Sequence, residues 1–297
     1  MDNSEKKLRV LFITKSATSN YHKLVAQGAM DQAKQEDIAL DVVAPAAESD
    51  YDIQKQYIID AIKTAKYQAV MLAPNHSKNL LEEINALCDA HIKVIIIDTP
   101  IDKVTSSPIK CDCGYVGTNN FLGGQLAAKY IKTRINGGNI VVIRGIHSHN
   151  TSIDRENGFV DEISKDKKFK IIAQLPGRWL YNESNKVYSK ILKENIKVDA
   201  VFAYSDPMAL GVAAHYKSSK KRPIIVGYNG DLDAQQAILK DKMDASVTQT
   251  PETMGRVGLK KLKLCHKYGK KDQESPFLIP VNIITSAKTL TTLKNFD

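Results

Sequence analysis

The stretch Leu8–Lys23 reads LRVLFITKSATSNYHK and joins an apolar run to a loop of small, polar and aromatic residues. The run Val10–Thr14 predicts a buried strand, because it is apolar and short. A nucleotide-binding domain would place a glycine-rich phosphate loop directly after such a strand, yet Thr14–Lys23 contains no glycine. The loop offers hydroxyls, an aromatic ring and an imidazole instead, which indicates a ligand other than a nucleotide.

Short β-branched runs alternate with helical patterns along nearly the whole chain, which is typical of βαβ units and a parallel sheet. Tyr51–Ala65 carries its apolar residues on one helical stripe. The run Val94–Ile97 is wholly apolar and predicts a strand buried on both faces. Strands are predicted at Val10–Thr14, Leu40–Val43, Ala69–Leu72, Val94–Ile97, Tyr115–Val116, Ile140–Arg144, Lys170–Gln174, Ala200–Ala203, Ile224–Val226, Ala245–Thr248 and Phe277–Ile284.

The strand, loop and helix pattern that begins at Val10 is repeated from Ile140 onward. With 297 residues the chain also exceeds the usual size of a single domain. We therefore expect two similar α/β lobes, each with its own core. Ligands of open parallel sheets bind at the carboxyl ends of the strands, so we expect one site shared by the two lobes.

Composition limits the class of protein. Hydrophobic residues make up 43% and charged residues 25% of the chain, and no apolar run approaches the roughly 18 residues of a membrane helix. The opening MDNSEKK lacks the features of a secretory signal, which leaves two expectations: a cytoplasmic protein, or one whose leader was removed. The four cysteines are too few for a disulfide scaffold, and Cys111 and Cys113 are predicted to be free thiols.

The formal charge of +9 suggests an anionic partner such as nucleic acid or a lipid surface. The lysines are scattered, however, and are densest at 218–223 and 260–271, where apolar residues interrupt them. A solvated surface is the favoured interpretation.

Several common chemical motifs are missing from the sequence. No G-x-x-x-x-G-K-[ST], G-x-S-x-G, H-E-x-x-H or C-x-x-C occurs, which disfavours nucleotide hydrolysis, serine hydrolysis, zinc proteolysis and thiol redox chemistry. His147 and His149 follow a predicted strand, but two ligands are too few for a structural zinc site. No catalytic residue, metal or cofactor is predicted.

Nine segments in order resemble one known family: LVAQGAMDQAKQ, AVMLAPN, KVIIIDTPID, YVGTNNFLGGQLAAKYI, GNIVVIRG, TSIDRENGF, VDAVFAYSDPMALG, PIIVGYNG and ASVTQTPETMGRVG. The chain resembles the periplasmic sugar-binding proteins of the ribose-binding type, whose ligand lobes are shared with lactose-repressor-type regulators. The resemblance implies a type I periplasmic binding protein fold, in which two doubly wound parallel-sheet lobes are joined by a three-strand hinge. It places the amino-terminal lobe at 1–117 and 250–280, and the carboxy-terminal lobe at 118–249 and 281–297.

The resemblance also implies a ligand site. A sugar ring presents C–H groups on its faces and hydroxyls at its edge, so it is bound by aromatic rings that stack on the faces and by hydrogen-bonding groups at the edge. Asp98 matches a hydroxyl acceptor, Arg155 a donor to ring and hydroxyl oxygens, and Trp179 a stacking ring opposite Tyr21. The predicted ligand-binding residues are Ser19, Tyr21, His22, Asp98, Thr99, Arg155, Trp179, Ser205, Asn229 and Gln249.

Three of these positions depart from the ribose binders. Thr99 stands in place of an arginine, Ser205 in place of an asparagine and Asn229 in place of an aspartate. Each change removes a charge or a hydrogen-bonding partner, which should shift specificity. We expect a small polar ligand, a sugar or related polyol, and do not assign it as ribose.

The leading functional hypothesis is an extracytoplasmic solute-binding protein that serves an ABC-type importer. Its partners would be a sugar-like ligand and a membrane permease or sensor receptor, without nucleic acid, and the protein would be a monomer. The predicted location is periplasmic or extracellular, with the signal peptide absent from this chain. The alternatives are a sensor domain or partner of a signalling receptor, and a lactose-repressor-type ligand domain lacking its DNA headpiece.

Overall fold

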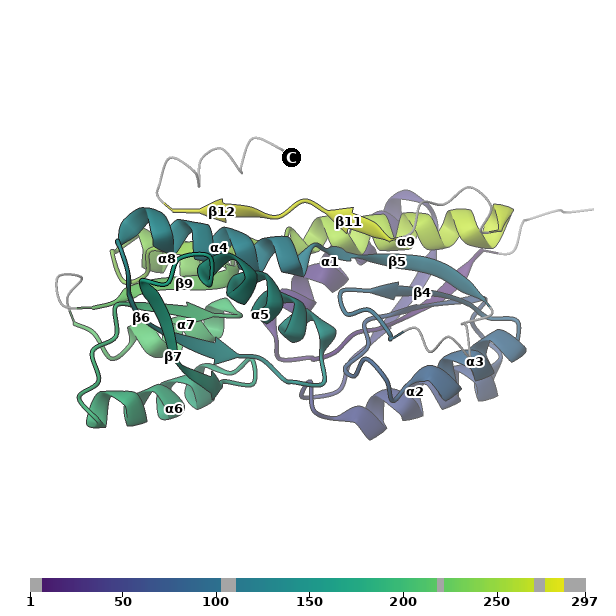
Figure 1. Cartoon of the computed structure of the whole chain (residues 1–297). Helices are drawn as coiled ribbons and strands as arrows, with labels where there is room; N and C mark the ends of the chain where they lie inside the picture. Colours follow the sequence, from purple (N-terminus) through teal and green to yellow (C-terminus); the bar gives the residue numbers. More distant parts are fainter. Residues whose placement is uncertain (1–6, 103–110, 218–221, 270–275, 286–297) are drawn as a thin grey trace, which may run out of the picture. The chain divides into compact units, whose positions relative to one another are not determined.

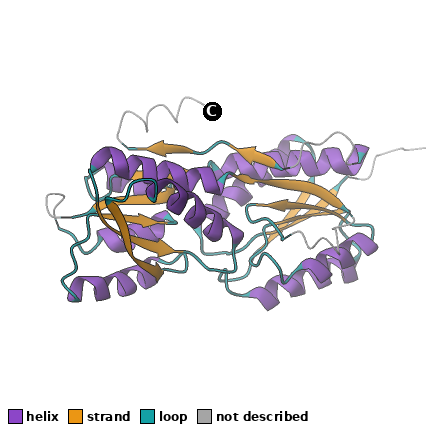
Figure 2. Cartoon of the chain, viewed as in Figure 1, coloured by secondary structure: helices purple, strands orange, loops and turns teal. Residues whose placement is uncertain are grey.

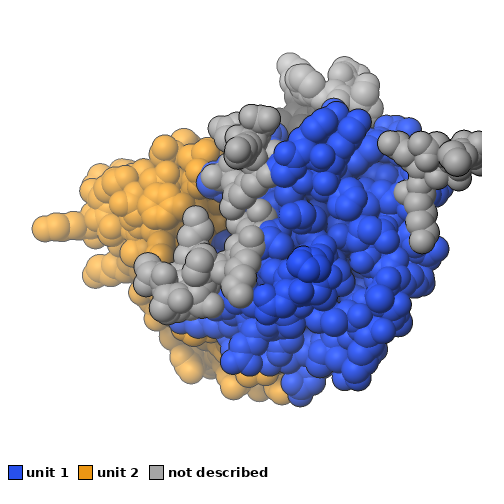
Figure 3. Space-filling view, turned by 90° about the vertical axis from the view of Figure 1, so that its right-hand side faces the viewer, with its two compact units in different colours: residues 1–118, 251–279 blue, residues 119–250, 280–297 orange. Residues whose placement is uncertain are grey.

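The computed structural model describes residues 7–102, 111–217, 222–269 and 276–285. The chain divides into two compact units, coloured separately in Figure 3. Unit 1 contains Met1–Thr118 and Pro251–Ile279, and unit 2 contains Asn119–Thr250 and Pro280–Asp297. The chain therefore passes from one unit to the other three times.

Unit 1 contains a six-stranded sheet in the order β11-β5-β4-β3-β1-β2, and all of its strand pairs are parallel (Figure 1). In chain order its elements are β1 (Arg9–Ile13), α1 (Asn20–Gln35), β2 (Ala39–Val43), α2 (Tyr51–Thr64), β3 (Ala69–Leu72), α3 (Leu81–Asp89), β4 (Lys93–Ile97), β5 (Asp112–Thr118), α9 (Pro251–Tyr268) and β11 (Phe277–Ile279).

Alternate residues of the unit 1 strands enter two separate cores. Val10 and Phe12 of β1 pack with residues of α1 and α9, whereas Leu11 and Ile13 of the same strand pack with residues of α2 and α3. Successive side chains of a strand point to opposite faces, so α1 with α9 and α2 with α3 cover the two faces of the sheet. This arrangement explains why the strands read as continuous apolar runs.

Unit 2 contains a second six-stranded sheet in the order β12-β10-β9-β8-β6-β7, in which only the β10–β12 pair is antiparallel. Helices flank this sheet as they do in unit 1 (Figure 2). In chain order its elements are α4 (Asn120–Arg134), β6 (Gly138–Arg144), α5 (Asn150–Ile163), β7 (Phe169–Pro176), α6 (Tyr181–Lys193), β8 (Ala200–Ala203), α7 (Asp206–Ala213), β9 (Ile224–Asn229), α8 (Leu232–Leu239), β10 (Ala245–Thr248) and β12 (Asn282–Ile284).

One close helix pair in each unit depends on glycine. A Cβ at Gly255 of α9 would lie 2.0 Å from the carbonyl oxygen of Val25 in α1, and a Cβ at Gly124 of α4 would lie 2.2 Å from the carbonyl oxygen of Arg155 in α5. Only glycine permits so close an approach of two backbones. These contacts set the positions of α1, which carries Tyr21, and of α5, which carries Arg155.

The prediction of a single late strand over Phe277–Ile284 was wrong. The segment forms two short strands, β11 and β12, which pair with β5 in unit 1 and with β10 in unit 2. Pro280 lies between them. Proline has no backbone N–H and cannot continue a ladder, which accounts for the interruption.

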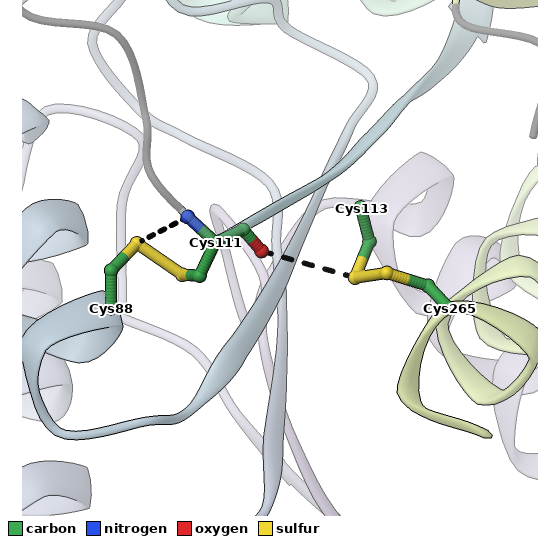
Figure 4. The surroundings of a disulfide bond; sticks show 4 residues. All are labelled: Cys88, Cys111, Cys113 and Cys265. Atoms are coloured by element: carbon green, nitrogen blue, oxygen red, sulfur yellow. Dashed lines mark hydrogen bonds between the residues drawn. A yellow bond between two sulfur atoms is a disulfide. The ribbon is translucent and has the colours of Figure 1, made fainter. Parts of the chain in front are cut away.

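The prediction that Cys111 and Cys113 are free thiols was also wrong. Cys111 is bonded to Cys88 of α3, and Cys113 is bonded to Cys265 of α9 (Figure 4). Since α3 and α9 cover opposite faces of the unit 1 sheet, the beginning of β5 is covalently tied to both. Within the part of the chain that the structure describes, no helix is long and apolar enough to cross a bilayer.

Candidate functional site

In unit 1, polar residues gather after the carboxyl ends of β1 and β4. Asp98 follows β4 directly, with a left-handed backbone (φ 62°), and is 5% exposed. Its carboxylate accepts a hydrogen bond of 3.1 Å from the hydroxyl of Tyr21 and another of 3.1 Å from the hydroxyl of Thr99. The structure therefore brings three of the predicted ligand residues into one hydrogen-bonded group.

Lys15 is a member of this group that the sequence analysis missed. It follows β1 by two residues, is 2% exposed, and forms a buried salt bridge with Asp98. Its ammonium also donates to the Thr99 hydroxyl at 2.5 Å. A cationic side chain thus contacts Thr99, at the position where the resemblance to the ribose binders implies an arginine. A lysine directly after an apolar strand was the available signal.

His22 lies beside this group but has a different partner. Its ring is 3% exposed, is edge-on to Tyr21 at 5.2 Å between ring centroids, and places Nε2 3.3 Å from a carboxylate oxygen of Glu48. Glu48 lies in the loop after β2 and was also missed, because its sequence context resembles an ordinary connection. Ser19 occupies the N-cap position of α1, and its side chain makes no cap hydrogen bond.

In unit 2, Arg155 of α5 is the centre of a second polar group. The residue is 4% exposed. Nε donates to Asn120 Oδ1 at 2.8 Å, Nη1 to the Tyr204 carbonyl at 2.5 Å, and Nη2 to Gln249 Oε1 at 3.1 Å. The guanidinium carbon also lies 3.7 Å from the ring centroid of Tyr228. Hydrogen bonds in the plane and a ring on one face fix the orientation of the guanidinium.

Gln249 and Asn229 extend this group. Gln249 Nε2 donates to Asn229 Oδ1 at 2.7 Å, and Asn229 Nδ2 donates to an oxygen of Asp231 at 3.1 Å. Ser205 precedes α7 at its N-cap position and is 4% exposed. Its hydroxyl has no hydrogen-bond partner among the described residues. Arg155, Asn229, Gln249 and Ser205 were predicted from the sequence. Asn120, Tyr228 and Asp231, which contact Arg155 or Asn229, were not.

Trp179 lies in the loop after β7, where Arg178 and Trp179 both have left-handed backbones (φ 52° and 68°). Its indole N–H donates to Nδ1 of His149 at 3.1 Å, and the two rings are stacked with centroids 5.9 Å apart. The Arg155 guanidinium lies 5.5 Å from the indole. The tryptophan is thus part of the Arg155 group, and His149 accepts its indole hydrogen bond.

A model of the periplasmic binding protein domain matches residues 10–271. The chain belongs to the periplasmic binding protein family. The resemblance to this family noted from the sequence motifs is therefore confirmed.

Curated relatives of this periplasmic binding protein include the D-allose-binding periplasmic protein of Escherichia coli strain K12, which is 26% identical over 87% of this chain and 84% of the relative. The D-apiose import binding protein of Paraburkholderia graminis is 24% identical over 94% of this chain and 87% of that protein. The match to each relative is low in identity and nearly complete in length.

Solved structures agree with the fold. An ABC transporter periplasmic solute binding protein from Actinobacillus succinogenes with bound D-allose has a TM-score of 0.88 and 23% identity, covering 98% of this chain and 100% of that one. A carbohydrate transporter solute binding protein from Agrobacterium radiobacter, in complex with D-arabinose, has a TM-score of 0.88 and 23% identity, covering 98% of each chain. The predicted fold class, two α/β parallel-sheet lobes of the type I periplasmic binding protein kind, is confirmed.

Proposed function

We propose that this protein is an extracytoplasmic solute-binding protein that captures a sugar or related polyol for an ABC-type importer. The observation that carries the proposal is the arrangement of Arg155. An arginine has five N–H donors, and three are used by Asn120, Tyr204 and Gln249. The other two have no partner among the described residues, and on a guanidinium held against Tyr228 they suit a ligand that presents neighbouring oxygen acceptors.

The group around Asp98 supports the same ligand class. Asp98 and Lys15 compensate each other's charge, and Tyr21 and Thr99 add hydroxyls to the same group. An ionised carboxylate with a bound ammonium forms strong, charge-assisted hydrogen bonds to hydroxyl groups. We propose that Lys15 joins the predicted residues Ser19, Tyr21, His22, Asp98 and Thr99 in unit 1 as a ligand contact, and that Arg155, Trp179, Ser205, Asn229 and Gln249 contribute from unit 2.

The two disulfides support a location outside the cytoplasm. Disulfides persist in oxidising compartments and are rare in the cytosol, and both bonds here tie elements of unit 1 together. The curated relatives are named as periplasmic or import binding proteins. We propose a periplasmic or extracellular location, a permease as partner, and binding without catalysis.

The test is a ligand panel read by thermal shift and by the fluorescence of Trp179, the single tryptophan of the chain. The panel contains D-allose, D-ribose, D-arabinose, D-apiose and myo-inositol. A ligand present at 100 times its Kd should stabilise the fold by about 2.7 kcal/mol. A panel in which no sugar or polyol produces a shift would contradict the proposal.

Variants then test the site in each unit separately. Arg155→Ala and Asp98→Ala should each abolish the ligand-dependent shift, because each removes a buried group that the ligand is proposed to contact. Arg256→Ala is the control, because Arg256 is a partly exposed arginine of α9 paired with Asp31. Unchanged affinity in Arg155→Ala would remove that residue from the site, and with it the observation on which the proposed function rests.

A further inference from the structure

Asp206, the first residue of α7, is completely buried and was given no role in the sequence analysis. Its Oδ1 accepts a hydrogen bond of 2.6 Å from the hydroxyl of Ser246 in β10, and its Oδ2 accepts one of 2.7 Å from the backbone N–H of Asp231. The Ser246 hydroxyl in turn accepts from the backbone N–H of Gly230 at 3.1 Å. One buried carboxyl thus holds two successive backbone groups of the loop between β9 and α8.

This loop has a backbone that needs such support. Asn229 and Gly230 have φ values of 127° and 78°. Glycine adopts positive φ readily, but an asparagine at 127° is strained. Strained residues persist where the surrounding structure holds them in place. Here the contacts of Asp206 with Asp231 and, through Ser246, with Gly230 supply that support.

Asn229 connects the loop to the Arg155 group. Its Nδ2 donates to Asp231 Oδ2 at 3.1 Å and its Oδ1 accepts from Gln249 at 2.7 Å, so both ends of the amide are oriented. We propose that Asp206 is a positioning residue of the ligand site, which holds the loop 229–231 so that Asn229 presents its amide in the orientation the ligand requires. The inference rests on the proposed function, because it concerns the same site.

The surroundings of Asp206 favour the protonated form. Asp231, at the N-cap position of α8, is the charged group that faces it, while β9 and β10 present Gly227 and Ser246, which do not titrate. Burial, reinforced by the charge of Asp231, raises the pKa of Asp206 to about 8. The carboxyl is therefore neutral below this pH and ionises above it, where it repels the carboxylate that holds Asn229.

The experiment compares D-allose and D-ribose binding by calorimetry between pH 6 and pH 9.5 for wild type, Asp206→Asn and Asp206→Ala. In wild type we expect affinity to fall at least about fivefold across this range, the lower end of typical coupling between sites. Asp206→Asn resembles the protonated carboxyl and should bind as wild type does at pH 6, without the alkaline loss. Asp206→Ala should bind weakly at every pH.

The control is Asp233→Asn, which changes the same charge on an exposed residue of α8 and should keep the wild-type pH profile. A wild-type pH profile in Asp206→Asn, or wild-type affinity in Asp206→Ala, would overturn the proposal. If Asp206→Ala does not fold, the profile of Asp206→Asn still decides.

A second measurement separates this inference from the proposed function. In the ligand-free protein, the side-chain amide resonances of Asn229 are followed by NMR over the same pH range. They should shift with the titration of Asp206 in wild type and stay constant in Asp206→Asn. If no sugar binds but these resonances shift with the titration of Asp206, the proposed function is rejected and the positioning of Asn229 by Asp206 stands. Constant resonances in wild type would reject the positioning role itself.

Discussion

Lys15 and Asp98 form a salt bridge in which the two side chains are 3% and 6% exposed, although they follow β1 and β4, two strands that are not neighbours in the unit 1 sheet. Removing one partner of a buried pair leaves an uncompensated charge and costs about 3–5 kcal/mol. The pair therefore couples the stability of unit 1 to residues that we also assign to ligand binding.

Lys15→Met should lower the free energy of unfolding by about 3 kcal/mol, measured by urea denaturation. Asp98→Asn should have a similar effect, and the double variant should lose less than the sum of the two, because neither charge is then left alone. Additive losses would show that the two residues do not interact.

Gly255→Ala should destabilise the protein by about 1–3 kcal/mol, because the new methyl group would overlap the Val25 carbonyl and push α1 from α9. Thermal denaturation measures the loss. The matched control is Gly258→Ala in the same helix, where the methyl group would meet the flexible end of Met71 at 3.0 Å. Equal losses in the two variants would contradict the close packing of α1 and α9.

Loss of the Cys113–Cys265 bond should lower the free energy of unfolding more than loss of the Cys88–Cys111 bond. The Cys113–Cys265 bond closes a loop over a sequence separation of 152 residues, whereas the Cys88–Cys111 bond closes a loop over a separation of 23 residues. Loop-closure entropy predicts about 5 kcal/mol for Cys265→Ser and about 3 kcal/mol for Cys88→Ser. Both variants are compared by denaturation with wild type under oxidising conditions. A reducing agent should lower the wild-type melting temperature; an unchanged value would argue against both bonds.

Lys132→Met should destabilise the protein near pH 7 but not near pH 3. The Lys132 ammonium donates a hydrogen bond to Glu162. This bond is the main reason why the pKa of the Glu162 carboxyl is below its usual value. When the pKa of a carboxyl is lower in the folded than in the unfolded protein, its ionisation stabilises the fold at pH values above the unfolded-state pKa. This stability is lost as the pH falls through the folded-state pKa. The loss near pH 7 should be at most about 1 kcal/mol, since the pair is partly exposed.

The control for this pair is Lys129→Met, which removes an exposed lysine of the same helix. It should leave stability unchanged at both pH values. A loss in Lys132→Met that is the same at pH 3 and pH 7 would indicate that packing of the lysine stem, and not the ion pair, carries the effect.

The fold could be predicted from the sequence because its signals are local. The runs Ala69–Leu72 and Ala200–Ala203 are strands at the predicted bounds, since a strand buried on both faces reads as a near-continuous apolar run. The disulfides could not be predicted in this way. Cys113 and Cys265 are adjacent only because α9 packs against the unit 1 sheet, and sequence spacing does not report such proximity.

The candidate site was predicted unevenly for a related reason. Asp98, Arg155 and Gln249 match family motifs and lie in the hydrogen-bonded groups. Lys15 and Asp206 were overlooked because their importance depends on burial, and sequence patterns predict both types of residue to be exposed.

The bond between Cys113 and Cys265 encloses the whole of Asn119–Thr250, the first of the two segments that the chain contributes to unit 2. A protease that cuts once anywhere between these cysteines, for example in the exposed loop at Lys193–Lys197, would leave both products covalently joined. On a non-reducing gel the nicked protein would migrate close to the intact size, and two fragments would separate only after the thiols are regenerated. The bond that joins β5 to α9 therefore also keeps a chain cut between these cysteines in one covalent piece.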